Sequence, residues 1–217
     1  MIVDLHLRGE KVVVVGGGLE GQKKVEALLT QDCEILVLSD KVNSTVQKYQ
    51  KEGKIEYIKE RLQDTKFLEK YHPYIVMATT NDKELNRKIV EKAKELNCIA
   101  YASDDPTISD FSHPSIINIQ DTIQVAVSTG GRSPVMARKL KLQAEKIFKE
   151  IVDAEDIFQI KLQEIARNAA KERLSDQKER KKYLYSLMSD NQIKQLIKDK
   201  KFKDAENRAL RLLGDWK

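Results

Sequence analysis

Cysteine is scarce in this chain of 217 residues, which contains only Cys33 and Cys98. The sequence has no C-x-x-C pair and no group of histidine and cysteine at zinc-binding spacing, so it indicates neither a disulfide framework nor a zinc site. Each cysteine lies in or beside a β-rich segment, where a buried thiol is the usual state. We therefore expect no metal ligands here.

Long apolar runs are also absent. No segment approaches the roughly 20 residues that cross a bilayer, and the opening MIVDLHLRGE lacks the apolar stretch and cleavage site of a signal peptide. Aromatic residues make up only 6% of the chain, and the formal net charge is +5. Nucleic-acid binders more often combine a basic stripe with interleaved aromatic residues. We predict a cytoplasmic protein with no membrane or nucleic-acid partner; a small polyanionic substrate is compatible with the charge.

Up to about residue 113, β-rich runs alternate with helical patterns, as they do in parallel α/β sheets. The predicted strands are Lys11–Val15, Glu34–Leu38, Ile55–Ile58, Tyr74–Ala78 and Cys98–Ala102. Helical patterns between them include Gln22–Leu29 and Lys83–Leu96. Right-handed crossovers between such strands give a doubly wound, Rossmann-like parallel sheet.

After His113-Pro114 the pattern changes. Isoleucine and valine alternate on either side of Gln120-Asp121, which indicates a pair of antiparallel strands. From about residue 135 the chain is helical in pattern, with breaks predicted at Ser175-Asp176 and Ser189-Asp190. An apolar stripe from Ile147 to Ala169 suits a packing or dimerisation module rather than a catalytic one.

The stretch KVVVVGGGLEGQKKV contains the G-x-G-x-x-G motif, made by Gly16, Gly18 and Gly21, between a strand pattern and a helical pattern. The first glycine suits a tight turn, the second a close approach of pyrophosphate, and the third close packing of helix on strand. The helix N-terminus, with Leu19 and Glu20, would offer free N–H groups to phosphates. The motif predicts dinucleotide binding; the alternative is a turn with a structural role only.

Two further segments extend this cofactor site. Asp40 lies about 20 residues after the glycines, where an acidic residue would bind the adenosine ribose and favour NAD over NADP. Lys41 beside it weakens that preference, and Asp40 could instead simply begin a loop. Thr79, Thr80 and Asn81 follow the fourth predicted strand, where they suit the cofactor crevice and equally suit helix capping.

At this point the sequence resembles a known family. The segments VVVGGGLEGQKK, ATTNDKELN, YASDDP with the following FSHP, and VAVSTGGRSPVMARKLK are together similar to precorrin-2 dehydrogenase, the dehydrogenase module of siroheme synthases. The resemblance covers residues 1 to about 145, and STGG-x-SP is its most specific part. Some members of the family also insert ferrous iron into the product.

The resemblance implies an organisation and an activity. The organisation is an NAD-binding Rossmann domain (1–113), a small β-containing dimerisation domain (114–146) and an all-helical C-terminal domain (147–217), assembled as a homodimer with the active site in the cleft. The activity is NAD-dependent oxidation of the tetrapyrrole precorrin-2 to sirohydrochlorin, with ferrochelatase activity as an open addition.

The resemblance also places the catalytic aspartate at Asp104, in the frame S-D-D-P, with the adjacent acid Asp105 as the alternative candidate for the same role. A carboxylate after the fifth strand suits the chemistry, because removal of a hydride must be accompanied by transfer of a proton to a base. Asp105-Pro106 alternatively forms a simple turn. His113 could shuttle protons or help to hold a metal, although a lone histidine is more often structural.

The STGGRSP segment suits an anion-binding turn that leads into a helix. Ser133 is a good N-cap and Pro134 suits the first helical position. We expect the first five residues of this segment to bind substrate carboxylates: Ser128, Thr129, Gly130, Gly131 and Arg132. Two other functions stay open: a non-catalytic NAD-sensing Rossmann module, and a Rossmann dehydrogenase for another small acid.

Overall fold

The computed structural model describes residues 2–216 and divides the chain into two compact units, Met1–His113 and Pro114–Lys217. The first unit contains a five-stranded sheet in the order β3-β2-β1-β4-β5, with every neighbouring pair parallel. Its strands are β1 (Lys11–Gly17), β2 (Glu34–Val42), β3 (Glu56–Lys59), β4 (Ile75–Ala78) and β5 (Ile99–Ala102). In this order strands are added to one side of β1 up to β3 and then to its other side from β4 on, as in a Rossmann-like sheet, so the predicted fold class is confirmed.

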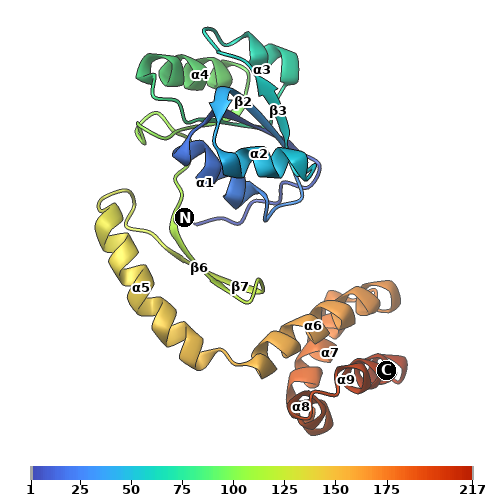
Figure 1. Ribbon diagram of the computed structural model, residues 1–217. Helices are drawn as coiled ribbons and strands as arrows, with labels where there is room; N and C mark the ends of the chain where they lie inside the picture. The colour runs from blue at the N-terminus through green and yellow to red at the C-terminus, as the bar shows by residue number, and fades with distance from the viewer. Residues whose placement is uncertain (1, 217) are drawn as a thin grey trace. The chain divides into compact units, whose positions relative to one another are not determined.

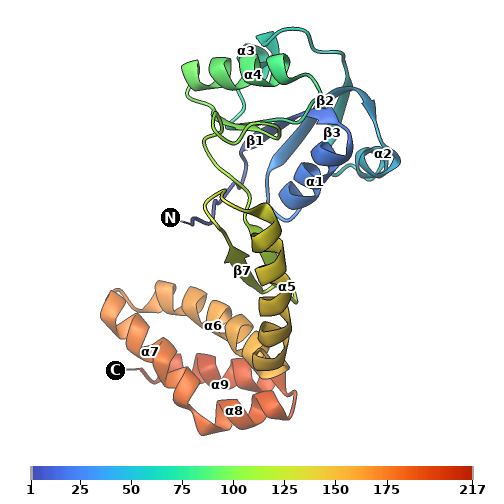
Figure 2. The same cartoon turned by 90° about the vertical axis from the view of Figure 1, so that its left-hand side faces the viewer.

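Helices cover both faces of this sheet (Figures 1 and 2). They are α1 (Leu19–Leu28), α2 (Ser44–Lys51), α3 (Lys66–Tyr71) and α4 (Lys83–Glu95). The side chains of β1 alternate between the two faces: Val13 and Val15 pack with α3 and α4, whereas Val12 and Val14 pack with α1 and α2. All four valines are at most 1% exposed, which explains why β1 reads as an unbroken apolar run.

The second unit begins with an antiparallel pair, β6 (Ser115–Ile119) and β7 (Ile123–Val127), as predicted. Gln120 and Asp121 both have positive φ and turn the chain between these strands. The helices that follow are α5 (Pro134–Ile151), α6 (Ala154–Arg173), α7 (Gln177–Ser189), α8 (Asn191–Lys198) and α9 (Phe202–Gly214). Helices α6 to α9 enclose their own core around the fully buried Tyr183 and Leu187 (Figure 1).

The predicted breaks in the helical region are confirmed, since Asp176 and Asp190 are the N-caps of α7 and α8. Two further breaks, between α5 and α6 and between α8 and α9, were not predicted. Asp153 and Asp156 form a capping box that begins α6, so the apolar stripe from Ile147 to Ala169 is divided between two helices. Helix α5 passes through residue 146 without interruption, and the division into 114–146 and 147–217 stays a prediction.

Candidate active site

The glycine loop and a polar pocket lie at the carboxyl ends of the parallel strands. Open α/β sheets bind ligands at this edge, between the strands where the order reverses, which here are β1 and β4. The pocket is lined by Val15, Gly16, Leu38, Ser39, Asp40, Glu60, Arg61, Leu62, Thr80, Asn81, Asp82 and Leu85. It therefore brings together residues from β1, from β2, from the segment after β3 and from the segment after β4.

Three glycines of this segment permit close backbone approaches that a side chain would prevent. Gly16 has φ of 105°, and a Cβ there would lie 2.9 Å from the carbonyl carbon and oxygen of Thr79. A Cβ on Gly21 would overlap the carbonyl oxygen of Gly16, so α1 could not pack as closely on β1. Gly17, which is not one of the three motif glycines, has the same role against Val42 and Lys41 of β2. The only signal for it was its place in the run of three.

Gly18 differs from these glycines because nothing lies within 4 Å of the position its Cβ would take. It is the N-cap of α1, with extended backbone and no side chain capping the first turn. Leu19 is 74% exposed, and Glu20 pairs with Lys23, 2.5 Å away. The first turn of α1 thus presents its N–H groups beside open space, as a pyrophosphate-binding helix does.

Asp40 lies within β2, which continues to Val42, so the alternative that Asp40 begins a loop is wrong. It is exposed and lines the pocket together with Glu60 and Arg61. Ser39, buried beside it, accepts a hydrogen bond from the Gly17 N–H (3.0 Å) and donates one to the Lys41 carbonyl (2.7 Å). These bonds fix the end of β2 against the glycine loop.

The segment after β4 is tied to the glycine loop by the buried Thr79. Its hydroxyl donates to the carbonyl oxygens of Val15 (2.9 Å) and Gly16 (3.2 Å). Thr80 and Asn81 line the pocket, and Asn81 is exposed. The N-cap of α4 is Asp82, whose carboxylate accepts the Leu85 N–H, so the alternative that Thr79, Thr80 or Asn81 caps this helix is wrong.

The two acidic residues after β5 differ in what their carboxylates bind. Asp105 accepts hydrogen bonds from both the N–H (2.9 Å) and the hydroxyl (2.6 Å) of Thr107, which lower its pKa and hold a local turn. Asp104 is exposed, and one of its oxygens accepts a hydrogen bond from the Asn86 amide at 2.7 Å. Of the two residues, Asp104 is the more exposed to solvent.

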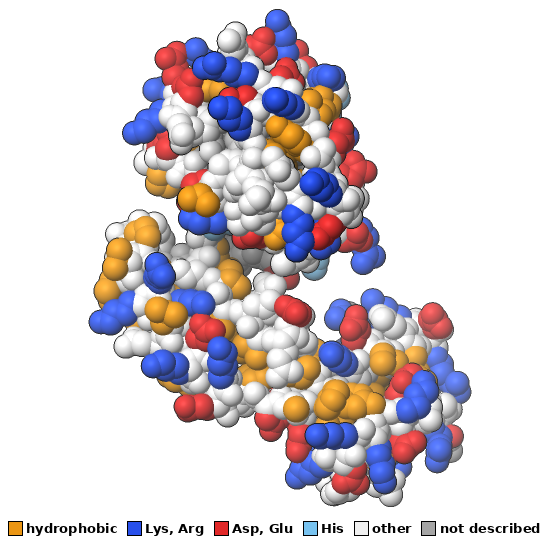
Figure 3. Space-filling view, in the orientation of Figure 1, with side chains coloured by type: hydrophobic (Ala, Val, Ile, Leu, Met, Phe, Trp, Pro, Cys, Tyr) orange, Lys and Arg blue, Asp and Glu red, His pale blue; other side chains and the backbone are white. Residues whose placement is uncertain are grey.

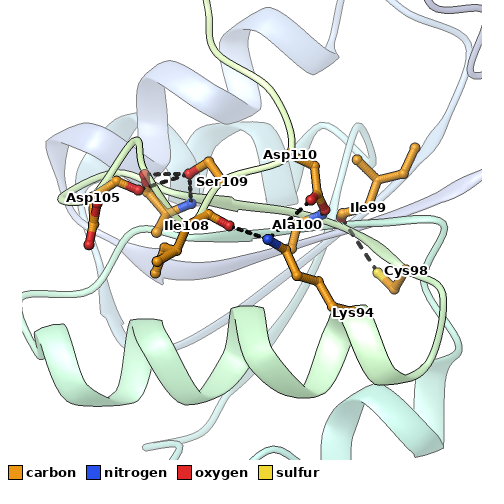
Figure 4. Close-up of polar contacts among 9 residues, drawn as sticks. Lys94, Cys98, Ile99, Ala100, Asp105, Ile108, Ser109 and Asp110 are labelled. Atoms are coloured by element: carbon orange, nitrogen blue, oxygen red, sulfur yellow. Dashed lines mark hydrogen bonds and ion pairs between the residues drawn. The ribbon is translucent and has the colours of Figure 1, made fainter.

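The loop that follows these acids returns along the open edge of β5 (Figure 4). The Asp110 carboxylate accepts the Ala100 N–H (2.9 Å), and the Ser109 hydroxyl accepts the Ala102 N–H (2.9 Å). Lys94 of α4 donates to the Ile108 carbonyl (2.7 Å) and pairs with Asp110. Because side chains occupy the edge of the last strand, the loop that begins at Asp104 has a fixed position.

A cluster of rings lies beside these residues. Tyr101 of β5 packs against Phe111 and His113, with ring centroids 5.4 Å and 5.0 Å apart, and the ammonium of the buried Lys24 lies 4.3 Å from the centroid of the Tyr101 ring. Burial raises the pKa of Tyr101, and the nearby Glu20 and Asp104 charges raise it further. Burial also lowers the pKa of Lys24.

His113 has contacts typical of a structural residue, because its ring packs edge-on against Phe111 as well as Tyr101. Packing of the ring and the Lys24 charge lower its pKa to about 4, although part of the residue surface is exposed. A neutral imidazole at pH 7 follows. Its assignment as a proton shuttle stays a prediction.

The STGGRSP loop lies in the second unit and begins α5 as predicted, with Ser133 as N-cap and Pro134 in the first turn. Thr129 holds the loop closed: its hydroxyl accepts the Ser133 N–H (3.0 Å) and donates to the Ser133 carbonyl (3.2 Å). Gly130 and Gly131 both have positive φ, and Ser128 accepts the Gly130 N–H. Arg132 is exposed. Substrate binding by these residues stays a prediction.

Neither a metal centre nor a membrane span is found in residues 2–216. No group of three or more histidine, cysteine, aspartate or glutamate side chains is gathered there as metal ligands would be. None of the described helices combines the length and the apolar character needed to cross a bilayer.

Comparison with known proteins gives two family matches. Residues 3–115 match the family described as "Putative NAD(P)-binding", and residues 120–143 match the one described as "Sirohaem biosynthesis protein central". The matched solved structures include SirC, precorrin-2 dehydrogenase, with a TM-score of 0.69 and 18% identity over 96% of this chain and 99% of that one. At this identity the likeness shows the fold.

Curated relatives include the siroheme synthase of Gluconobacter oxydans, 35% identical over 68% of this chain and 31% of its own length. That of Actinobacillus pleuropneumoniae is 28% identical over 93% of this chain and 40% of its own length. The chain thus spans well under half of these relatives. The resemblance found in the sequence motifs is confirmed, and because the first family model matches more than half of the residues, the chain belongs to this NAD(P)-binding family.

Proposed function

We propose that this protein catalyses the NAD-dependent oxidation of precorrin-2 to sirohydrochlorin. The observation that carries the proposal is the position of Asp104: an exposed carboxylate, held by one oxygen, follows β5 at the same sheet edge as the glycine loop. The matches to siroheme synthases and to the central sirohaem segment supply the substrate class.

The residues present fit a dinucleotide. Open space at Gly18 leaves room for a pyrophosphate against the backbone, and the first turn of α1 supplies N–H donors. Asp40, Glu60 and Asp82 line the pocket with three carboxylates, against the guanidinium of Arg61. A 2′-phosphate would be repelled by these carboxylates, so NAD fits better than NADP. When bound, NAD supplies the hydride acceptor.

Asp104 supplies the base. Conversion of precorrin-2 to sirohydrochlorin removes two hydrogens, one as hydride and one as a proton. The free Asp104 oxygen takes the proton while the other oxygen remains hydrogen-bonded to Asn86. Tyr101 stays protonated at neutral pH because its pKa is raised, so it can donate a hydrogen bond beside this carboxylate but cannot act as a base.

The test is anaerobic incubation with precorrin-2 and NAD, followed by NADH absorbance and the tetrapyrrole spectrum. Asp104→Asn keeps an acceptor for Asn86 and removes the base, so we expect normal NAD binding and a loss of turnover by about 100-fold or more. Asp105→Asn is the matched control, since it can still accept from Thr107, and should turn over at nearly the native rate. NAD binding without turnover by the native chain would instead support a sensing module.

We also propose that the chain forms a homodimer through α5, whose surface is shown in Figure 3. Exposed apolar side chains occur along this helix: Val135, Met136, Leu140, Leu142, Ile147 and Ile151. One shallow groove on it is lined by Val135 and Leu142 with basic neighbours. Leu142→Glu should convert a dimer to a monomer in sedimentation, and a native monomer would refute the proposal.

A cytoplasmic location is part of the same proposal. Both cysteines are free in the structure, as thiols are in a reducing compartment, and NAD is the proposed cofactor.

A further inference from the structure

Asn86 is the most deeply buried polar side chain of the first unit, with 0% exposure, and it lies in the first turns of α4. A buried amide in a helix is costly unless each of its hydrogen-bonding groups has a partner. We propose that Asn86 is a positioning residue, which orients the Asp104 carboxylate and fixes the distance between it and the cofactor-binding segment after β4. This inference rests on the proposed function.

The amide makes four hydrogen bonds with two residues only. Its oxygen accepts from the Thr80 N–H (3.2 Å) and the Thr80 hydroxyl (2.7 Å). Its nitrogen donates to the Thr80 carbonyl (3.0 Å) and to Asp104 Oδ1 (2.7 Å). Both lone pairs and both hydrogens are therefore used. If the amide were flipped, its oxygen would lie against the Asp104 carboxylate oxygen and the Thr80 carbonyl oxygen, which are both acceptors. Only the observed orientation of the amide therefore makes all four hydrogen bonds.

This arrangement connects two parts of the site that are distant in sequence. Thr80 lines the pocket and follows Thr79, which is bonded to the glycine loop, whereas Asp104 follows β5. The Asn86 amide is thus hydrogen-bonded both to Thr80, in the cofactor-binding segment, and to Asp104, the proposed base. Because one Asp104 oxygen is occupied by Asn86, the rotation of the carboxylate is restricted and the other oxygen keeps a defined direction.

Asn86→Asp tests the role with almost no change in shape. The new side chain still accepts from the Thr80 N–H and hydroxyl. Its other oxygen replaces the amide nitrogen, 2.7 Å from Asp104 Oδ1 and 3.0 Å from the Thr80 carbonyl oxygen, so both donated bonds are lost. Two carboxylates this close share a proton. We expect the acidic limb of the kcat–pH profile to move up by about one unit or more, and kcat at neutral pH to fall by about tenfold or more, with a smaller change in KM for NAD.

The other titratable groups near this pair must be considered in the pH profile. The Asp104 charge contributes to raising the pKa of Tyr101 above that of an ordinary tyrosine, so Tyr101 does not titrate on the acidic limb of the profile. Asp105 is held by Thr107, and the Arg87 charge also lowers its pKa. Asp105→Asn should therefore leave the acidic limb in its native position and serves as the control.

The double variant Asn86→Asp/Asp104→Asn separates positioning from folding. It restores an amide–carboxylate hydrogen bond with donor and acceptor exchanged, but the Thr80 carbonyl still lacks the donor that Asn86 supplied, so part of the Tm lost in Asn86→Asp should return while turnover stays absent. Strictly additive changes in Tm would overturn the proposed coupling, even if the native chain proved inactive.

Activity data decide the rest. If the native chain oxidises precorrin-2 and Asn86→Asp lowers only Tm, with an unmoved pH profile, Asn86 is structural and the positioning role is wrong while the proposed function stands. If the native chain binds NAD without turnover, the proposed function fails, and only the Tm cycle bears on Asn86.

Discussion

Gly18→Ala should weaken NAD binding without harming the fold. The backbone there is extended, with φ of −76° and ψ of −164°, which alanine adopts without strain, and nothing lies within 4 Å of the added methyl. Because alanine leaves the unfolded chain fewer conformations than glycine, the substitution should raise the free energy of unfolding by about 0.4–1 kcal/mol. We therefore expect an equal or slightly higher Tm.

The expected loss of affinity follows from the phosphate contacts. A methyl on Gly18 occupies the space in which a pyrophosphate would approach the first turn of α1, so at least one N–H bond to a phosphate oxygen is lengthened or lost. A hydrogen bond to a charged group contributes about 1.5–3 kcal/mol. The Kd for NAD should rise by about 10- to 150-fold, measured by calorimetric titration.

Gly21→Ala is the matched comparison because the same added methyl should lower stability there, whereas at Gly18 it should lower only the affinity for NAD. There it would overlap the Gly16 carbonyl oxygen, so α1 must move off β1. Overpacking of this kind costs about 1–3 kcal/mol, or roughly 4–12 °C in the Tm of a unit this size. Native NAD affinity in a stable Gly18→Ala protein would refute the assignment of this loop to pyrophosphate.

Three further outcomes are expected. Asp40→Asn should narrow the preference for NAD over NADP by about tenfold, because it removes one charge that repels a 2′-phosphate; unchanged Kd values for both would place the ribose elsewhere. The pKa of His113 is lowered to about 4 in the folded protein, whereas in the unfolded chain it is about 6.5. Above pH 6.5 the histidine is neutral in both states and costs no stability; as the pH falls from 6.5 to 4, the unfolded chain binds a proton first and the free energy of unfolding decreases. His113→Phe should flatten that part of the Tm–pH curve, by an amount reduced through solvent screening; a curve parallel to the native one would contradict the burial argument. Ser109→Ala leaves the Ala102 N–H without its partner and should lower stability by about 1–3 kcal/mol in urea unfolding, whereas a neutral result would mean that water replaces the hydroxyl.

The sequence by itself determined the sheet and the glycine loop. Strand and helix periodicities are local properties of the chain, and β1 is recognisable because four consecutive valines are needed to fill both faces of a parallel sheet. The roles of Gly16 and Gly21 were predicted for the same reason: their spacing is set by one tight turn between a strand and a helix. The capped breaks at Asp176 and Asp190 are likewise local signals.

Tertiary structure alone decided which polar groups face one another. Asp104 and Asp105 are neighbours in sequence, and only the folded loop shows that Thr107 holds one carboxylate while Asn86 reaches the other from a different element. Asn86 carries no signal in the sequence beyond being a polar residue beside the apolar positions of a helix. Hydrogen bonds between residues 18 positions apart depend on how α4 packs on the sheet, and no local pattern records that packing.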